Sequence, residues 1–202
     1  MPVTVGMYEK GLARIGPRLD ALGLDINVLT FDREGQFVID GRQVAPQEVA
    51  LDYLWISPDI SGDGIQEPTF ELALGCKALD VMQTFNAGLD APYYKRISGR
   101  GVRICNSSAQ AIAISEYVLG NVLAAFQPLE RQRALQKARE WQRTPFREIA
   151  RTNWLIFGFG PIGQEVARRA KAFGATTTII RRTPETGELA DKAGTLADVP
   201  AL

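Results

Sequence analysis

The stretch Asn153–Arg182, which reads NWLIFGFGPIGQEVARRAKAFGATTTIIRR, predicts a strand, a glycine-rich turn, a helix and a second strand. The apolar run Trp154–Phe157 is typical of a strand that is buried on both faces. An amphipathic segment over residues 164–173 predicts a helix, and Gly174 stands where such a helix would end. Residues 176–180 form the second strand-like run. This order is that of a β-α-β unit in a parallel sheet.

Three glycines, Gly158, Gly160 and Gly163, follow the first strand in the spacing G-x-G-x-x-G. The first permits a tight turn, the second lets the backbone approach a pyrophosphate, and the third lets the helix pack close to the strand. Free N–H groups and a positive dipole at the start of the helix also favour an anion there. The motif in this context predicts dinucleotide binding. The turn residues expected to contribute are Gly158, Phe159, Gly160, Pro161, Ile162 and Gly163.

The end of the second strand indicates which dinucleotide is preferred. A site specific for NAD places Asp or Glu at this point, whereas Arg181, Arg182 and Thr183 stand here. A guanidinium can bind a 2′-phosphate with paired N–H donors, and a carboxylate would repel it. The same arginines could instead be solvated residues at a strand end. The pattern favours NADP over NAD and leaves NAD open.

The composition excludes several classes of protein. The chain has 202 residues, 46% of them hydrophobic, and a formal net charge of zero, so no global field draws it to nucleic acid or to an anionic membrane. Cys76 and Cys105 lie far apart and form no metal-ligand cluster. The sequence shows neither a signal peptide nor an apolar segment long enough to span a bilayer. We therefore expect a cytoplasmic protein that binds no metal.

The first hundred residues alternate strand-like and helix-like segments, which predicts an α/β fold with a flavodoxin-like first domain. Expected strands cover residues 3–8, 26–31, 51–56, 79–85 and 101–105, with a hairpin over residues 37–44 that turns at Asp40-Gly41. Expected helices cover residues 10–22, where Pro17 could break the helix, and residues 70–77. The polar, glycine-rich residues 60–68 are expected to form a loop.

A small-residue loop, Asn86-Ala87-Gly88, follows the expected strand over residues 79–85. Ligands in open α/β sheets bind beyond the carboxyl ends of the strands, and backbone N–H groups in such a loop could bind a carboxylate. The loop could equally be a plain turn before the helix that carries Tyr93, Tyr94 and Ile97. The residues alone leave both interpretations open.

A long helix is expected from about Gln110 towards Trp141, kinked or divided at Pro128. Its first half is apolar on nearly every face, which indicates burial between domains or subunits. Its second half is rich in basic residues, but it lacks the interleaved aromatic residues of a nucleic-acid surface. A solvated face or a subunit contact is favoured over nucleic-acid binding.

Taken together, the Asn86-Ala87-Gly88-Leu89-Asp90 loop, the Ser115-Glu116 helix, Trp141 and the glycine motif make the chain resemble the D-isomer-specific 2-hydroxyacid dehydrogenases. The resemblance implies a flavodoxin-like substrate domain over residues 1–102 and a Rossmann cofactor domain over residues 103–202, incomplete at its C-terminus. It also implies that Asn86, Ala87 and Gly88 bind the substrate carboxylate through backbone N–H groups. Family members with arginine at the place of Arg181 tend to prefer NADPH and to reduce small 2-keto acids such as glyoxylate or hydroxypyruvate, so the resemblance implies this substrate class.

One feature departs from the resemblance in a way that matters for activity. The family uses Arg, Glu and His in catalysis, and those residues are expected beyond Leu202; the 202 residues contain no histidine. The chain therefore resembles an N-terminal portion of such an enzyme, expected to be inactive alone and to form a homodimer through the long helix. The alternative is a non-catalytic NAD(P)-binding module or a pseudoenzyme.

Overall fold

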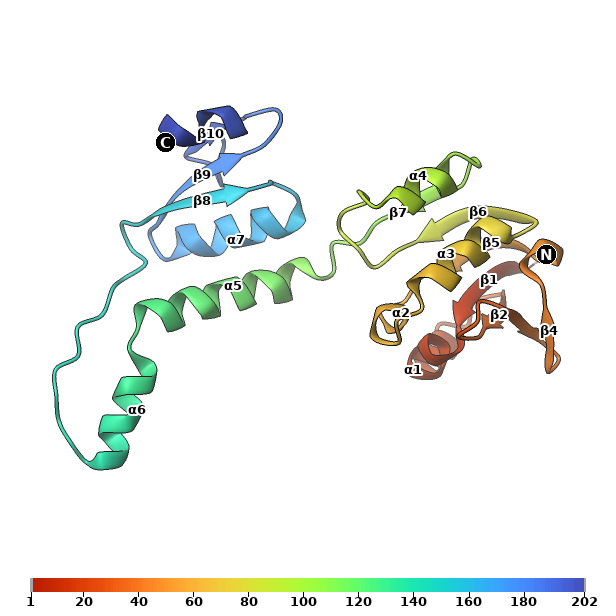
Figure 1. Ribbon diagram of the computed structural model, residues 1–202, viewed down its shortest axis with the longest axis horizontal. Helices are drawn as coiled ribbons and strands as arrows, with labels where there is room; N and C mark the ends of the chain where they lie inside the picture. The colour runs from red at the N-terminus through yellow and green to blue at the C-terminus, as the bar shows by residue number, and fades with distance from the viewer. Residues whose placement is uncertain (1, 202) are drawn as a thin grey trace. The chain divides into compact units, whose positions relative to one another are not determined.

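A computed structural model describes residues 2–201 and divides the chain into two compact units, Met1–Ser107 and Ser108–Leu202 (Figure 1). Both units are α/β structures with predominantly parallel strands, as the sequence predicts. Each unit has its own sheet and its own hydrophobic core. They are therefore described one at a time.

The first unit contains a seven-stranded sheet of order β4-β3-β2-β1-β5-β6-β7. Its parallel strands are β1 (Val3–Tyr8), β2 (Ile26–Phe31), β5 (Ala50–Trp55), β6 (Ala78–Gln83) and β7 (Arg103–Cys105). Taken by themselves they run β2-β1-β5-β6-β7, which is the strand order of flavodoxin. The strand order reverses between β1 and β5, so ligands are expected beyond the carboxyl ends of these strands.

An antiparallel hairpin forms one edge of this sheet. β3 (Phe37–Ile39) pairs with β4 (Arg42–Val44) through the turn at Asp40 and Gly41. The two turn residues have φ angles of 49° and 74°, as a two-residue hairpin turn of type I′ requires. The Asp-Gly pair thus has the backbone conformation for which these two residue types are favoured.

The helices of the first unit are α1 (Glu9–Asp20), α2 (Asp59–Gly62), α3 (Gln66–Gly75) and α4 (Pro92–Ser98), with a 3-10 turn, η1, at Pro46–Glu48. Pro17 lies inside α1 without ending it. The loop predicted over residues 60–68 is wrong, since it holds part of α2 and the start of α3. Ile60 and Ile65 bury their side chains in the core, and this burial outweighs the local glycine-rich composition.

The core of the first unit lies between the sheet and these helices. Its largest fully buried side chains include Tyr8, Phe31, Phe37, Leu54, Ile56, Met82 and Ile97. Strand β7 belongs to this unit because it pairs in parallel with β6. The unit therefore extends to Ser107, whereas the sequence places the domain boundary after Val102.

The second unit contains a three-stranded parallel sheet of order β10-β9-β8. Its strands are β8 (Asn153–Phe157), β9 (Thr176–Ile180) and β10 (Lys192–Gly194), followed by the 3-10 turn η2 (Leu196–Ala201). Helix α7 (Pro161–Ala172) connects β8 to β9 and packs on the sheet, while α5 (Ala111–Phe126) packs against α7 (Figure 1).

Strand β8 differs from the sequence prediction of a strand buried on both faces. Ile156 is buried, but the side chains on the opposite face, Leu155 and Phe157, are 41% and 60% exposed. Helix α7 covers one face of β8, and no described element covers Leu155 and Phe157 on the other. Among residues 2–201, β8 pairs with β9 alone and forms an edge of the sheet.

The long helix is divided at Pro128, as predicted. Helix α5 ends at Phe126 and α6 (Leu129–Ala138) begins at a bend of 58°. Helix α6 ends before Trp141, because Arg139 adopts a left-handed conformation with φ of 57°. Within the described residues, no single helix has the length and apolarity needed to cross a membrane; only α5 and α6 taken together, a bent pair, meet these criteria.

Asp191 links three elements of the second unit. Its carboxylate accepts hydrogen bonds from Lys171 Nζ in α7 and from the backbone N–H of Thr177 in β9, the latter at 2.8 Å. The lysine and then the Thr177 amide lower the pKa of Asp191 from 3.8 to about 2. A carboxyl group whose pKa is lowered by folding stabilises the fold above its unfolded pKa, and this stability is lost as the pH falls through the folded value.

We predict that Asp191→Asn lowers the melting temperature of the second unit by about 2–4 °C at pH 7. A charge-assisted contact contributes about 1 kcal/mol when it is partly exposed to solvent. The difference from the parent should shrink as the pH falls from about 4 to about 2, where Asp191 becomes protonated in the parent too. Thermal unfolding followed by circular dichroism measures both effects. Glu185→Gln, at an exposed carboxylate that forms no ion pair with any described residue, is the control and should leave the melting temperature unchanged.

Candidate cofactor-binding groove and anion-binding loop

The glycine turn between β8 and α7 has the geometry that its spacing predicts. Gly158 has a φ of 87°, and its N–H donates to the carbonyl of Ile180 at 2.8 Å. A Cβ atom on Gly163 would lie 2.3 Å from the carbonyl oxygen of Gly158, so only glycine allows α7 to pack this close to the turn. A Cβ atom on Gly160 would meet nothing within 4 Å. The backbone at Gly160 is therefore open to a ligand.

Helix α7 begins directly at this open position. Gly160 is its N-cap and Pro161 is its first residue, and no side chain caps the helix. The first N–H groups of a helix have no partner within the helix, and the dipole makes this end partly positive. The start of α7 is thus suited to bind a phosphate group with backbone donors.

A groove of about 1050 Å³ lies over this turn. It is lined by Phe157, Gly158, Phe159, Gly160, Ile180, Arg181, Arg182, Thr183, Thr195, Leu196 and Ala197. Six of the predicted cofactor residues are therefore brought together in one groove. Pro161, Ile162 and Gly163 do not line it; Ile162 packs against the buried cluster under the sheet, and Gly163 contacts the turn.

Arg181 and Arg182 give the groove its charge. Neither guanidinium forms an ion pair or a side-chain hydrogen bond among the described residues, and no acidic residue lines the groove. The N–H of Arg181 donates to the carbonyl of Gly194 at 3.0 Å, which holds the backbone at the end of β9. Two guanidinium groups without an ion pair among the described residues thus stand at the position where an NAD-specific site has a carboxylate.

Sequence reasoning missed the part of the groove that comes from the end of β10. Thr195, Leu196 and Ala197 lie there, since β10 pairs with β9 and ends at the same edge of the sheet. Thr195 is held by Asp198, which accepts hydrogen bonds from its N–H at 2.7 Å and its hydroxyl at 2.8 Å. The T-x-x-D spacing after a short strand is the sequence signal that could have identified this wall.

The loop Asn86-Ala87-Gly88 lies beyond β6 in the first unit, and buried hydrogen bonds fix its first residue. The N–H of Asn86 donates to Thr84 Oγ1 at 3.2 Å, and its Nδ2 donates to the hydroxyl of Tyr94 at 2.7 Å. That hydroxyl is also hydrogen-bonded to Thr84 Oγ1 at 3.0 Å. Both Thr84 and Tyr94 are buried. The side chain of Asn86 therefore points into the fold, and its N–H already has an acceptor.

The two residues that follow keep their donors available. No protein acceptor is assigned to the N–H of Ala87 or of Gly88 in the part of the chain that the structure describes. Gly88 is exposed and Ala87 is half-buried. Two successive free N–H groups can bind a carboxylate, so the loop is a candidate anion site with Ala87 and Gly88 as the donors.

A second polar cluster in the first unit is held together by its own contacts. Asp63 accepts hydrogen bonds from Lys10 Nζ at 2.6 Å and from the Tyr8 hydroxyl at 2.8 Å. Burial and the bond to Asp63 raise the pKa of Tyr8 to about 12, so this phenol does not release its proton readily. The cluster ties β1 and α1 to the segment after α2 and serves the fold.

Known proteins resemble the part of the chain that holds the glycine turn and the groove. Residues 119–202 match the family model described as the NAD binding domain of D-isomer specific 2-hydroxyacid dehydrogenases. A hydroxypyruvate reductase of Thermotoga maritima is 31% identical over 101 residues, which are 48% of this chain and 33% of that protein. A D-3-phosphoglycerate dehydrogenase of Methanocaldococcus jannaschii is 31% identical over 117 residues, 56% of this chain and 22% of that protein.

Solved structures extend the similarity to both units. An NADPH-dependent glyoxylate/hydroxypyruvate reductase from Sinorhizobium meliloti, in complex with NADP and sulfate, superposes with a TM-score of 0.69 at 20% identity, covering 100% of this chain and 58% of that one. A family member from Aeromonas salmonicida gives 0.68 at 22% identity, with 98% and 60% covered. Residues 119–202 are therefore similar to the NAD binding domain of the D-isomer-specific 2-hydroxyacid dehydrogenases, and the solved structures show a similar fold.

The chain spans less than two thirds of each of these relatives. The family model covers the second unit from Leu119 onward, which includes the glycine turn and the groove. NAD(P) binding is therefore the family property that the matched residues carry.

We predict that alanine at Gly163 lowers the stability of the second unit, whereas alanine at Gly160 lowers its affinity for NADPH. Gly163→Ala should destabilise the second unit by about 2 kcal/mol or more, because the new methyl group would lie against the Gly158 carbonyl. Gly160→Ala should fold with nearly the parent's melting temperature, since its methyl group enters open space, but should weaken binding of NADPH at least tenfold by occupying the place of the pyrophosphate. Thermal unfolding and fluorescence titration with NADPH separate the two effects. Equal melting temperatures and equal affinities for both variants would contradict this assignment of the turn.

Proposed function

We propose that this chain supplies the substrate loop and the cofactor groove of an NADPH-dependent reductase that converts a small 2-keto acid, such as glyoxylate or hydroxypyruvate, into the D-2-hydroxy acid. The observation that carries the proposal is the groove at the glycine turn, where Arg181 and Arg182 at the end of β9 form no ion pair within residues 2–201. The match of residues 119–202 to the NAD binding domain of 2-hydroxyacid dehydrogenases supports the reaction type. The glyoxylate/hydroxypyruvate reductase among the structural neighbours and the hydroxypyruvate reductase among the sequence relatives support the substrate class.

The preference for NADPH follows from the charge at the end of β9. The 2′-phosphate of NADP carries about two negative charges, and a guanidinium binds it with two parallel N–H donors. Arg181 and Arg182 are available for this because they have no ion pair of their own among the described residues. Thr183 adds a hydroxyl at the same wall of the groove. NADH has a neutral ribose hydroxyl in place of the 2′-phosphate, so it offers no negative charge to the guanidinium groups of Arg181 and Arg182.

The substrate is proposed to bind by its carboxylate to the loop after β6. The N–H groups of Ala87 and Gly88 supply two donors. Nicotinamide would supply the hydride when it is bound, and reduction also needs a proton donor for the alkoxide that forms. The family uses histidine for this step, and the 202 residues contain none. We therefore propose that this chain binds its ligands without reducing the keto acid by itself.

We predict that the 202-residue chain binds NADPH at least tenfold more tightly than NADH. Arg181→Ser should remove most of this preference, weakening NADPH by about tenfold while changing NADH by less than twofold, because only NADPH carries the 2′-phosphate. Isothermal titration with each cofactor measures the four affinities. Arg168→Ser, at an exposed arginine of α7 that does not line the groove, is the matched control and should change neither affinity.

A reductase assay with NADPH and glyoxylate separates the proposal from the alternative, a non-catalytic NAD(P)-binding module. Oxidation of NADPH by this chain alone would contradict the proposal that it lacks its proton donor. Affinity for cofactor without any change of the loop amides on addition of a 2-keto acid would favour the module. Equal affinities for NADPH and NADH would contradict the role given to Arg181.

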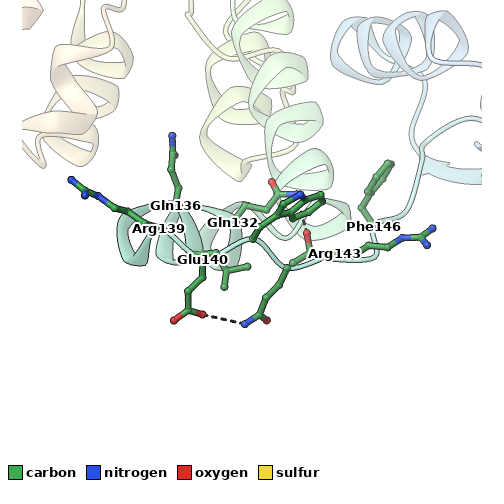
Figure 2. Close-up of a pocket in the computed structure, with 10 residues that line it drawn as sticks. Gln132, Gln136, Arg139, Glu140, Arg143 and Phe146 are labelled. Atoms are coloured by element: carbon green, nitrogen blue, oxygen red, sulfur yellow. Dashed lines mark hydrogen bonds between the residues drawn. The ribbon is translucent and has the colours of Figure 1, made fainter.

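We also propose that the chain forms a homodimer through the arm, defined as residues 127–147. Helix α6 in this arm has no buried residue. The segment after α6 returns alongside it, with Gln132 Nε2 donating to Thr144 Oγ1 at 3.3 Å and Arg147 N–H donating to the Phe126 carbonyl at 3.0 Å. Figure 2 shows the residues lining the space between them, among them Gln132, Gln136 and Phe146.

Several large apolar side chains of the arm and of α5 are exposed to solvent in a single copy of the chain. Trp141 is 87% exposed, Phe146 is 64% exposed and Tyr117 of α5 is 72% exposed. Apolar surface of this kind is typical of an interface. The arm also carries charges of both signs: Glu140 accepts a hydrogen bond from Gln142, and Arg139 and Arg143 form no ion pair in the part of the chain that the structure describes (Figure 2). A second copy offers a matching surface under twofold symmetry.

We predict a dimer of the 22.2 kDa chain in solution that Trp141→Ser together with Phe146→Ser converts to a monomer. Loss of two aromatic anchors should raise the dimer dissociation constant at least tenfold. Multi-angle light scattering over a concentration series measures the mass. The control is Leu22→Ser, at a leucine 67% exposed in the first unit, which should stay dimeric. A parent chain that is monomeric at all concentrations would overturn the proposed interface.

A further inference from the structure

The orientation of the Asn86-Ala87-Gly88 loop is set by the residues that follow β7. The carbonyl of Asn86 accepts a hydrogen bond from the N–H of Ser107 at 3.0 Å. The next carbonyl, that of Ala87, accepts one from Asn106 Nδ2 at 2.8 Å. Two successive peptide units are therefore held by their carbonyl oxygens to the same neighbouring segment.

These two bonds decide where the N–H groups of the loop point. The structure contains no cis peptide among the described residues, and in a trans peptide the C=O and the N–H point in opposite directions. The N–H groups paired with these carbonyls are those of Ala87 and Gly88. Both are consequently directed away from residues 106–107, and neither has an acceptor among the described residues.

We propose that Asn106 is a positioning residue for substrate binding, which turns the N–H of Gly88 towards the carboxylate by holding the carbonyl of Ala87. This inference rests on the proposed function of the loop as the carboxylate site. Of the two bonds that orient the loop, the one from Ser107 comes from the backbone, and the one from Asn106 comes from a side chain. Asn106 is thus the point at which a substitution can change the orientation.

Asn106 is well placed because its own backbone is fixed. Gln83 Nε2 donates to the carbonyl of Asn106 at 3.0 Å and to that of Thr84 at 2.8 Å. The N–H of Thr84 donates to the carbonyl of Cys105 at 2.9 Å, which continues the pairing of β6 with β7. The loop is therefore held by a segment that is itself hydrogen-bonded to the end of β6.

Without the Asn106 side chain, the peptide between Ala87 and Gly88 would be free to rotate. Glycine on its C-terminal side lowers the barrier to other backbone conformations. A rotated peptide would present its carbonyl oxygen to the ligand, and this oxygen repels a carboxylate. One of the two donors would then be lost and replaced by an acceptor.

Heteronuclear NMR on the 15N-labelled 202-residue chain tests the proposal in two steps. The first step compares the 15N shift of Gly88 in the parent and in Asn106→Ala, since this shift responds to hydrogen bonding at the preceding carbonyl. We expect a change confined to Ala87, Gly88 and their neighbours. Asn121→Ala is the matched control, because Asn121 is also an exposed asparagine whose Nδ2 donates to a backbone carbonyl, that of Tyr117. It should leave the loop signals unchanged.

The second step titrates each protein with oxalate as a stable analogue of a 2-keto acid. The parent should show saturable shifts of the Ala87 and Gly88 amides, and Asn106→Ala should weaken binding about five- to tenfold. Asn106→Asp keeps the shape, loses the donor and adds a negative charge, so it should weaken oxalate binding further. The remaining signals of each spectrum show whether the variant is folded.

Each result decides between distinct conclusions. Unchanged Gly88 shifts and an unchanged oxalate affinity in Asn106→Ala would overturn the positioning role while leaving the proposed function intact. A parent chain whose loop amides do not respond to oxalate, although Asn106→Ala does change the Gly88 shift, would overturn carboxylate binding by the loop. The proposal would fail with it, and Asn106 would remain a structural contact.

Discussion

The close approach of α7 to the turn after β8 is the constraint on which the cofactor groove depends. Gly163 brings the helix to a distance from the Gly158 carbonyl that no side chain would allow. This contact places the start of α7 directly behind the turn, whose residues Gly158 and Gly160 line the groove together with Arg181 at the end of β9. The helix dipole therefore acts close to the groove.

The same logic of strand ends applies in both units. In the first unit the loop Asn86-Ala87-Gly88 leaves β6, and in the second the glycine turn leaves β8. Each follows the carboxyl end of a parallel strand, where backbone donors are not used up by the sheet. Both are suited to anions although the chain has no net charge. The binding properties thus come from local backbone geometry, to which side-chain charge adds only at Arg181 and Arg182.

Much of this arrangement could be predicted from the sequence where a pattern was local. The β-α-β unit, the Asp40-Gly41 hairpin and the break at Pro128 depend on glycine, proline or strand periodicity within a few residues, and all three are present. Residues 60–68 were predicted as a loop because their composition is polar and rich in glycine. There Ile60 and Ile65 reach a core formed by distant strands, and the gain from burial is not visible in a short window.

The exposure of Leu155 and Phe157 has a related cause. An apolar run of four residues indicates a strand that has apolar neighbours available on both faces. The apolar composition of β8 predicts burial on both of its faces, whereas the elements within residues 2–201 cover only one face. Strand β8 has α7 on one face and β9 at one edge, so half of its apolar surface is covered. Composition and observed burial agree at Ile156 and differ at the two residues beside it.

Backbone donors explain why the positioning residues escape sequence reasoning. A carboxylate bound by the N–H groups of Ala87 and Gly88 needs no particular side chain at either position, so the loop is recognisable only by its small residues. The side chains that decide whether those N–H groups are available are Thr84, Tyr94 and Asn106, which touch the loop from its far side. Two of them are buried and resemble ordinary core residues, and the third lies on a different strand end. When backbone N–H groups bind the ligand, the side chains on which binding depends are those that hold the backbone in place, and not those of the loop itself.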